Sequence, residues 1–261
     1  MDSQQLLAAF DEQIRQRPDP HPSPGSIEYS DGLVRSTNSD EGWAGVLWSG
    51  LDSSNADDVI AAQVERFADL PYPWEWKHYS YDQPPDLPAR LRAAGFQPEP
   101  AETLLVAEIA ALGLETSPPA GVELRSIVDQ HGINALVSVH DEVFGGDHAA
   151  MGRQVFAGVC DQPPSVIGVV AWAGATPISA GRVQFHAGTD FASLWGGGTL
   201  PEWRGRGVFR AMVAYRAAEA TARGFRYLQV DATPDSRPIL QRLGFIELAT
   251  TTPFIFPANG G

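Results

Sequence analysis

The C-terminal half of the chain alternates short apolar runs with stretches in which apolar residues recur at helical spacing. Apolar runs of strand length, broken by Gly, Pro and Asp, predict strands near residues 122–126, 165–173, 178–187, 191–199, 225–231, 245–250 and 253–256. The periodic stretches predict helices near residues 129–144, 148–159, 208–223 and 235–243. Strands and helices in this order indicate an α/β fold, in which helices cover the faces of a mixed sheet.

The N-terminal half has a similar but shorter pattern. It predicts strands near residues 28–36, 43–51, 74–80 and 103–109, and helices near residues 3–16, 56–70 and 87–94. A polar, proline-rich segment at residues 115–121 separates the two halves. We therefore predict two domains, residues 1–115 and 121–261, joined by a linker at residues 116–120.

The two halves also resemble each other in sequence. At a spacing of 149 residues, six identities fall in register: Asp82 with Asp231, Pro85 with Pro234, Asp86 with Asp235, Leu91 with Leu240, Gly95 with Gly244 and Phe96 with Phe245. Both sets follow the same order of predicted elements, which is a strand, a turn, a short helix and a further strand. Several matches in register, with matching elements, indicate an internal duplication.

Composition narrows the class of protein. The chain has 261 residues, of which 43% are hydrophobic and 19% charged, as in an ordinary globular protein. No apolar run reaches the roughly 20 residues of a membrane span, and the acidic, amphipathic N-terminus does not resemble a signal peptide. A single cysteine, Cys160, excludes an internal disulfide framework and fits a reducing compartment. We therefore expect a cytoplasmic protein with no membrane partner, in which Cys160 is a buried, inert thiol.

The net charge of −14 argues against a nucleic-acid partner, because the phosphate backbone would be repelled. The same charge favours cationic partners such as amines, although acidity also simply keeps proteins soluble. The histidines show no metal-ligand spacing and there is no second cysteine to join Cys160, so we expect no metal site.

The most informative segment is PEWRGRGVFR, residues 201–210, which lies between a predicted strand and a predicted helix. The first N–H groups of a helix have no internal partner, and the helix dipole adds partial positive charge there. Gly205 and Gly207 allow a phosphate to approach the backbone closely, and Arg204 and Arg206 add full charges. The segment therefore predicts a pyrophosphate site, with a helix-starting turn that carries surface arginines as the alternative.

This segment resembles the motif of the GNAT acyl-CoA N-acyltransferase superfamily, in which Arg or Gln, two further residues, Gly, one residue, and Gly or Ala open a helix. Supporting marks are Ala180-Gly181-Arg182, the helix end at Ala222-Arg223-Gly224, and Leu240-Gln241-Arg242-Leu243-Gly244-Phe245. Phe209 departs from the small residue usual at its position. The resemblance covers about residues 122–256, and the internal repeat makes the first half a second, degenerate copy. It implies two GNAT-like domains in tandem.

The resemblance also implies an activity, which is transfer of an acetyl group from acetyl-CoA to a primary amine of a small molecule or peptide. The implied coenzyme-binding residues are Thr199, Leu200, Arg204, Gly205, Arg206, Gly207, Val208, Phe209, Arg210, Thr233 and Ser236. Strand 191–199 would diverge from a parallel neighbour near residues 225–231, and the coenzyme arm would lie at that divergence. The glycine run 196–198 predicts a bulge or a close approach of ligand or backbone.

The catalytic residues are less clear from the sequence. Many GNAT enzymes place a general-acid Tyr where this chain has Leu240, which we expect in the core, and strand 191–199 carries no Glu that could act as a base. Candidate bases are Glu142 and Asp231, with Asp141, His148 and His186 as further possibilities. Asp231 could instead cap a turn, as its repeat partner Asp82 would.

In the first half, Asp57 and Asp58 stand where the repeat places the phosphate loop, so we expect that half to bind no coenzyme. An inactive acyl-CoA-binding or regulatory protein is therefore the alternative function. The acceptor and the oligomeric state stay open.

Overall fold

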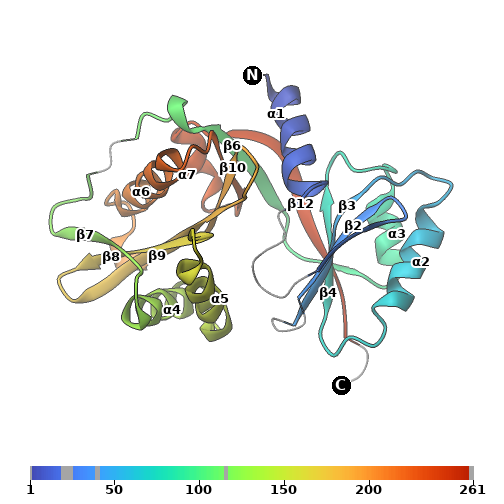
Figure 1. The fold of residues 1–261 in the computed structure, drawn as a ribbon, viewed down its shortest axis with the longest axis horizontal. Helices are drawn as coiled ribbons and strands as arrows, with labels where there is room; N and C mark the ends of the chain where they lie inside the picture. The colour runs from blue at the N-terminus through green and yellow to red at the C-terminus, as the bar shows by residue number, and fades with distance from the viewer. Residues whose placement is uncertain (1, 19–25, 39–41, 115–116, 259–261) are drawn as a thin grey trace. The chain divides into compact units, whose positions relative to one another are not determined.

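The computed structural model describes residues 2–18, 26–38, 42–114 and 117–258, and these form two compact units (Figure 1). Unit 1 comprises Met1–Leu105, Asp231–Pro238 and Glu247–Gly261, and unit 2 comprises Val106–Val230 and Ile239–Ile246. The units are thus not consecutive stretches of chain, whereas the sequence comparison divides the chain near residue 115 into two copies. No helix in the described ranges is both long and apolar enough to cross a bilayer.

Unit 1 is an α/β unit whose strands run in the order β1-β2-β3-β4-β12, with β3 and β4 parallel and the other pairs antiparallel. Its elements are α1 (Ser3–Phe10), a π-helical turn (Asp11–Arg15), β1 (Ser26–Ser30), β2 (Leu33–Asn38), β3 (Trp43–Ser49), α2 (Ala56–Arg66), β4 (Trp74–Tyr79), α3 (Leu87–Ala93), β5 (Gln97–Pro98), the first part of β6 (Glu102–Glu108), which continues into unit 2 after Leu105, and β12 (Ile246–Phe256) from Glu247 onward. The core includes Ile60 of α2, Leu91 of α3 and Trp76 of β4, so both helices pack against the sheet.

Unit 2 is also α/β, and its strands run in the order β7-β8-β9-β10-β11. Its elements are a 3-10 turn (Ile109–Ala111), β7 (Val122–Ser126), α4 (Gln130–Phe144), α5 (Ala149–Cys160), β8 (Val166–Ala173), β9 (Thr176–Phe185), β10 (Phe191–Thr199), a second 3-10 turn (Pro201–Trp203), α6 (Val208–Ala222), and most of β11 (Tyr227–Ala232) and of α7 (Arg237–Arg242). Asp231 and Ala232 of β11, and Arg237 and Pro238 of α7, belong to unit 1. The β10–β11 pair is parallel, and the β7–β8, β8–β9 and β9–β10 pairs are antiparallel.

Helices cover both faces of the unit 2 sheet. Val166 and Val170 of β8 pack with Leu136 of α4, whereas Val169, between them in sequence, packs with Met212 of α6. Because successive strand residues point to opposite faces, α4 lies on one face and α6 on the other. This places the start of α6 and the inner side of α4 on opposite sides of β10.

The predicted mixed α/β architecture is confirmed, and most predicted elements of the second half end within two residues of the observed ones. The single strand predicted at 28–36 is wrong. It is the hairpin β1–β2, because Asp31 and Gly32 both adopt positive φ, at 56° and 70°, which a two-residue hairpin turn requires. The strands predicted at 245–250 and 253–256 form one strand, β12. The expectation of a buried Cys160 is also wrong, since this residue is exposed.

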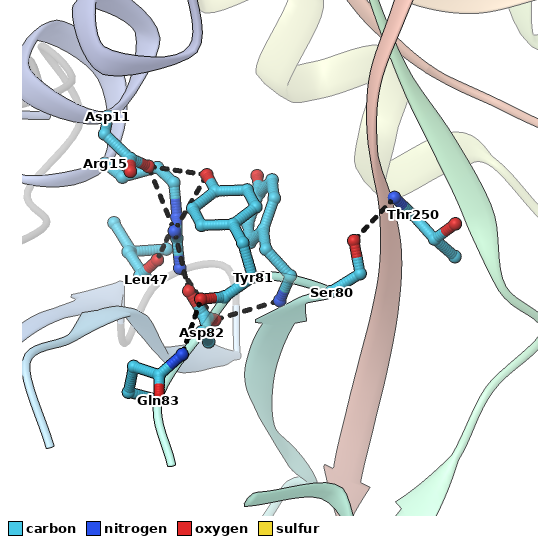
Figure 2. A network of polar contacts seen from close by, with 9 residues as sticks. Asp11, Arg15, Leu47, Ser80, Tyr81, Asp82, Gln83 and Thr250 are labelled. Carbon is cyan, nitrogen blue, oxygen red and sulfur yellow. Dashed lines mark hydrogen bonds and ion pairs between the residues drawn. The ribbon is translucent and has the colours of Figure 1, made fainter. Parts of the chain in front are cut away.

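A buried ion pair anchors the N-terminal segment within unit 1 (Figure 2). Both guanidinium ends of Arg15 contact Asp82, with Nη1–Oδ1 at 2.9 Å and Nη2–Oδ2 at 3.0 Å. Asp82 also accepts a hydrogen bond from the Tyr79 backbone N–H at 2.9 Å, so it holds the turn after β4. Arg15 further donates to the Leu47 carbonyl and to the hydroxyl of Tyr81. One side chain therefore ties the N-terminal segment to β3 and to the turn after β4.

Candidate functional site

The segment that precedes α6 is shaped by two glycines. Gly205 and Gly207 adopt left-handed backbone conformations, with φ of 72° and 86°. Arg204 donates from Nε to the Thr199 carbonyl at 3.0 Å, which closes the loop onto the end of β10. The guanidinium of Arg206 lies 4.8 Å from the centre of the Trp203 ring. The chain can make this turn because glycine tolerates positive φ at little cost.

This loop presents unused hydrogen-bond donors. None of the backbone N–H groups of residues 205–210 donates to another described residue, and the first bond of the helix is from the Ala211 N–H to the Gly207 carbonyl. The exposed side chains of Arg204, Arg206 and Arg210 form no ion pair within the described part of the chain. Free N–H groups, a helix dipole and three unpaired cations together make a favourable position for a phosphate or pyrophosphate.

The corresponding turn of unit 1, before α2, is closed by its own carboxylate. Asp52 accepts hydrogen bonds from the backbone N–H groups of Ser54 at 2.7 Å and Asn55 at 3.2 Å. Asp57, in the first turn of α2, pairs with Arg90 at 2.8 Å. An anion here would meet the negative charges of the first turn of α2, and the N–H groups of the preceding turn are already used.

Beyond the loop, β10 and β11 pair over a short stretch. Their parallel ladder joins Phe191 with Tyr227, Ala192 with Leu228 and Ser193 with Gln229, although β10 continues to Thr199. The backbone of β10 after Ser193 therefore lacks this neighbour. The divergence expected of these strands is present in unit 2, and it leaves strand backbone available to a ligand.

The glycine run of β10 forms an irregular stretch, as expected. The β9–β10 register shifts between Trp195 and Gly198, and Gly196 has a positive φ of 56°. A Cβ atom at Gly196 would lie 2.6 Å from the His140 ring, one at Gly197 would lie 3.1 Å from the Phe209 ring, and one at Gly198 would lie 3.0 Å from Val143. The glycines thus make room for side chains from both helix layers, and Phe209 turns its ring toward the sheet.

The candidate base Glu142 lies on the exposed side of α4. It lines a groove between α4 and α5 together with Asp141, Ser138 and Arg153. The α4 residues that contact the glycines of β10 are instead His140, Val143 and Phe144. His148 donates its backbone N–H to Asp141, and its Nδ1 lies 2.9 Å from the same carboxylate.

The other candidate base, Asp231, belongs to unit 1 together with Thr233 and Ser236. Its side chain is 7% exposed and its Oδ2 pairs with Lys77 Nζ at 3.1 Å. The turn-capping interpretation is wrong, because Asp231 accepts no backbone hydrogen bond among the described residues and its buried Oδ1 has no partner there. Thr233 and Ser236 contact each other, Oγ1 to Oγ at 3.2 Å, in the turn before α7.

Carboxylates surround Lys77 in this part of unit 1. Glu102 Oε2 lies 3.5 Å from Lys77 Nζ, and burial raises the pKa of both Glu102 and Glu75 although Lys77 opposes this. Leu240, where many GNAT enzymes carry the general acid, is buried in unit 2 as expected. Among the described residues, no group of three or more potential metal ligands lies close together.

His140 is a buried residue that the sequence did not single out. Its Nε2 lies 2.8 Å from the Gly196 carbonyl, and burial lowers its pKa to about 4 even though this hydrogen bond opposes the shift. The ring is therefore neutral at pH 7, and Nε2 carries the proton that it donates to Gly196. A single histidine in a helical pattern carries no signal of such a contact, since its partner is 56 residues away.

This burial makes the stability of unit 2 depend on pH. The unfolded histidine, with a pKa near 6.5, binds a proton that the folded one does not, so stability is complete above pH 6.5 and is lost as the pH falls toward 4. We expect the wild type to lose about 2 kcal/mol more than His140→Gln between pH 7.5 and pH 5. Urea unfolding at both pH values measures the difference, and superimposable pH profiles of the two proteins would contradict it.

Comparison with solved structures identifies the fold. The chain has the fold of the GNAT N-acetyltransferases. It matches a GCN5-related N-acetyltransferase from Kribbella flavida with a TM-score of 0.71 and 17% identity, over 99% of this chain and 96% of that one. It also matches a GCN5-related N-acetyltransferase from Sphaerobacter thermophilus, with a TM-score of 0.64 and 13% identity, over 98% of this chain and 92% of that one.

A third similar structure is a tandem GNAT protein from the clavulanic acid biosynthesis pathway. Its TM-score is 0.62 at 14% identity, over 99% of this chain and 95% of that one. No family model matches the sequence, and no curated protein matches it significantly. At these identities the likeness establishes the fold, so the activity has to be argued from the residues themselves.

Proposed function

We propose that this protein is an N-acetyltransferase that transfers the acetyl group of acetyl-CoA to a primary amine of a small molecule or peptide. The observation that carries the proposal is the set of unused backbone N–H groups from Gly205 to Arg210, next to three unpaired arginines, in a chain with the GNAT fold. These donors fit a pyrophosphate, which carries two negative charges and many acceptor oxygens.

When bound, acetyl-CoA supplies a thioester whose carbonyl carbon the amine attacks, forming the amide bond while the carbon–sulfur bond breaks. The residues of this chain would bind the coenzyme and orient its thioester. The segment 205–210 would hold the pyrophosphate, and the backbone of β10 beyond Ser193 is available to the thioester arm because the β11 ladder has ended. Backbone donors placed there can polarise a carbonyl, as oxyanion holes do.

Transfer also needs two proton movements. Leu240 cannot protonate the leaving thiolate, so water would do so, and a thiolate is already a fair leaving group. The incoming ammonium must lose a proton, for which Asp231 and Glu142 are the candidates. Asp231 keeps one oxygen without a partner among the described residues, whereas Glu142 is exposed.

The difference between the starts of α6 and α2 predicts that each chain binds one coenzyme molecule. The α6 start offers free donors beside arginines, whereas the α2 start carries Asp57 and Asp58 and follows a turn whose N–H groups already bond to Asp52. Isothermal titration with coenzyme A should therefore give a stoichiometry close to one. Two sites per chain would contradict the assignment of unit 1 as a non-binding copy, and no heat at millimolar coenzyme would contradict the proposed function.

An acyl-CoA-binding protein without transferase activity is the second candidate. The buried Leu240 and the absence of Glu from the described strand β10 favour it. Acetyl-CoA that binds but releases no thiol in the presence of a broad panel of amines would select this alternative.

A further inference from the structure

Arg182, on β9, is a half-buried cation without a partner among the described residues. Its guanidinium makes no hydrogen bond or ion pair with any residue in the described ranges. Burial lowers its pKa to about 10, so it still carries its charge at pH 7. This is unusual in a chain with 32 acidic and 18 basic residues, since a cation partly removed from water without a counter-charge is destabilising.

The surroundings of Arg182 place it at the irregular stretch of β10. Arg182 pairs in register with Trp195, so both side chains lie on the same face, and Trp195 is 36% exposed. Arg182 Nη1 lies 3.1 Å from the position of a Cβ at Gly196, next to the ring of His140. His140 is neutral there, and Phe144, at the end of α4, is exposed. The α4 side of the bulge thus combines two exposed aromatic rings with one unpaired guanidinium.

A second arginine, which is buried, lies behind Arg182, on the face of the unit 2 sheet that α6 covers. Arg216 of α6 is fully buried, donating from Nε to the Met212 carbonyl at 3.0 Å and from Nη1 to the Arg182 carbonyl at 3.3 Å. It forms no ion pair with a described residue either, and burial together with the charge of Arg182 lowers its pKa to about 10. Two positive charges therefore flank this part of the sheet with no acidic side chain paired to either.

We propose that Arg182 binds an acidic group, a carboxylate or a phosphate, on the acyl acceptor. The proposal rests on the function proposed above. If the coenzyme binds at the α6 start, an acceptor that attacks the thioester directly has to approach from the side of β10 that α6 does not cover. That side is the α4 face, where Arg182 lies. The acceptor class is then an amine that also carries an oxyanion, such as an amino acid or an amino-phosphate, since a guanidinium fork matches either group.

The overall charge of the chain fits this class. A net charge of −14 repels simple acids but acts only weakly on a zwitterion with one ammonium and one acidic group. A local cation would then make the protein bind an amino acid more tightly than the same amine without its carboxylate. Arg182 would be a specificity-determining residue that acts mainly on KM, because it touches a part of the acceptor that does not react.

The experiment measures binding of matched probes to wild type, Arg182→Gln and Arg182→Lys, all saturated with coenzyme A. One arm compares pooled L-amino acids with their carboxamides, and the other compares phosphoethanolamine with ethanolamine. Arg125→Gln, at an exposed position on β7, is the matched control. We expect the acidic member of one arm to bind about 10- to 100-fold more tightly than its neutral counterpart in wild type and in Arg125→Gln. Arg182→Gln should abolish this preference and Arg182→Lys should restore part of it.

Coenzyme binding within twofold of wild type shows that each variant is folded. A preference for the acidic probe in the amino-acid arm indicates a carboxylate ligand, and a preference in the phosphoethanolamine arm indicates a phosphate ligand. Equal binding of acidic and neutral probes to wild type, or an unchanged preference in Arg182→Gln, would overturn the assignment and leave the proposed function intact. If coenzyme A itself fails to bind, the proposed function fails, and the same probes are titrated into the coenzyme-free protein, where the same preference is expected.

Discussion

Gly207→Asp is expected to reduce the affinity for coenzyme A by at least about 100-fold. Gly207 precedes α6, its N–H has no described partner, and the space around its Cβ position is open, with Pro119 as the nearest atom at 3.8 Å. A carboxylate therefore fits without a clash, and its charge stands close to the pyrophosphate. One pair of like charges about 4 Å apart costs about 4 kcal/mol at the effective dielectric of a protein surface. Isothermal titration calorimetry measures the loss.

The other end of the same helix supplies a matched control. Gly224 has a φ of 83°, close to the 86° of Gly207, and its Cβ position meets no atom within 4 Å. Gly224→Asp carries the same backbone strain and charge but should bind coenzyme A as the wild type does. Gly207→Asn, which is neutral and tolerates positive φ, should lie between the two. Equal affinities of Gly207→Asp and Gly224→Asp would contradict the placement of the pyrophosphate at residues 205–210.

Arg15→Met is expected to destabilise unit 1 by about 3–5 kcal/mol, because it leaves the carboxylate of Asp82 buried without its cation. Arg15 is 2% exposed and Asp82 is 7% exposed, so water cannot easily replace the lost contacts. Amide hydrogen exchange over β4, which precedes the turn held by Asp82, should quicken by a factor of about 100 or more.

The double variant separates the charge effect from the loss of packing. Arg15→Met with Asp82→Asn removes both charges, and an Asn can still accept from the Tyr79 N–H. We expect it to recover part of the stability lost by Arg15→Met alone. A double variant whose loss equals the sum of the two single losses would show that the two charges do not act as a pair.

The loop that precedes α6 could be located from the sequence because its signals are local. The loop 201–210 lies between a strand and a helix that are contiguous in the chain, and its two glycines adopt positive φ in the turn between them. A local signal of the same kind exists at Asp31-Gly32, because an Asp-Gly pair between two apolar runs is typical of a hairpin turn, whereas apolar periodicity alone predicts one strand there.

The remaining features depend on contacts between residues far apart in sequence. Arg15 and Asp82 are 67 residues apart, and His140 and Gly196 are 56 apart. An arginine in an amphipathic N-terminal helix is typical of an exposed helix face, so its burial could not be read from the sequence. Arg182 supported the family resemblance only as part of a strand motif, because a missing partner becomes visible only in the folded chain.

The order of segments in unit 1 has a consequence for synthesis. Strand β12 pairs with β4 along Thr251–Phe256, yet the whole of β7 to β11 separates the two strands in the chain. During synthesis, the edge of β4 that pairs with β12 therefore stays unpaired until β12 has left the ribosome. During that interval the open edge of β4 can pair with strands of other nascent chains, so aggregation during synthesis is expected to begin there.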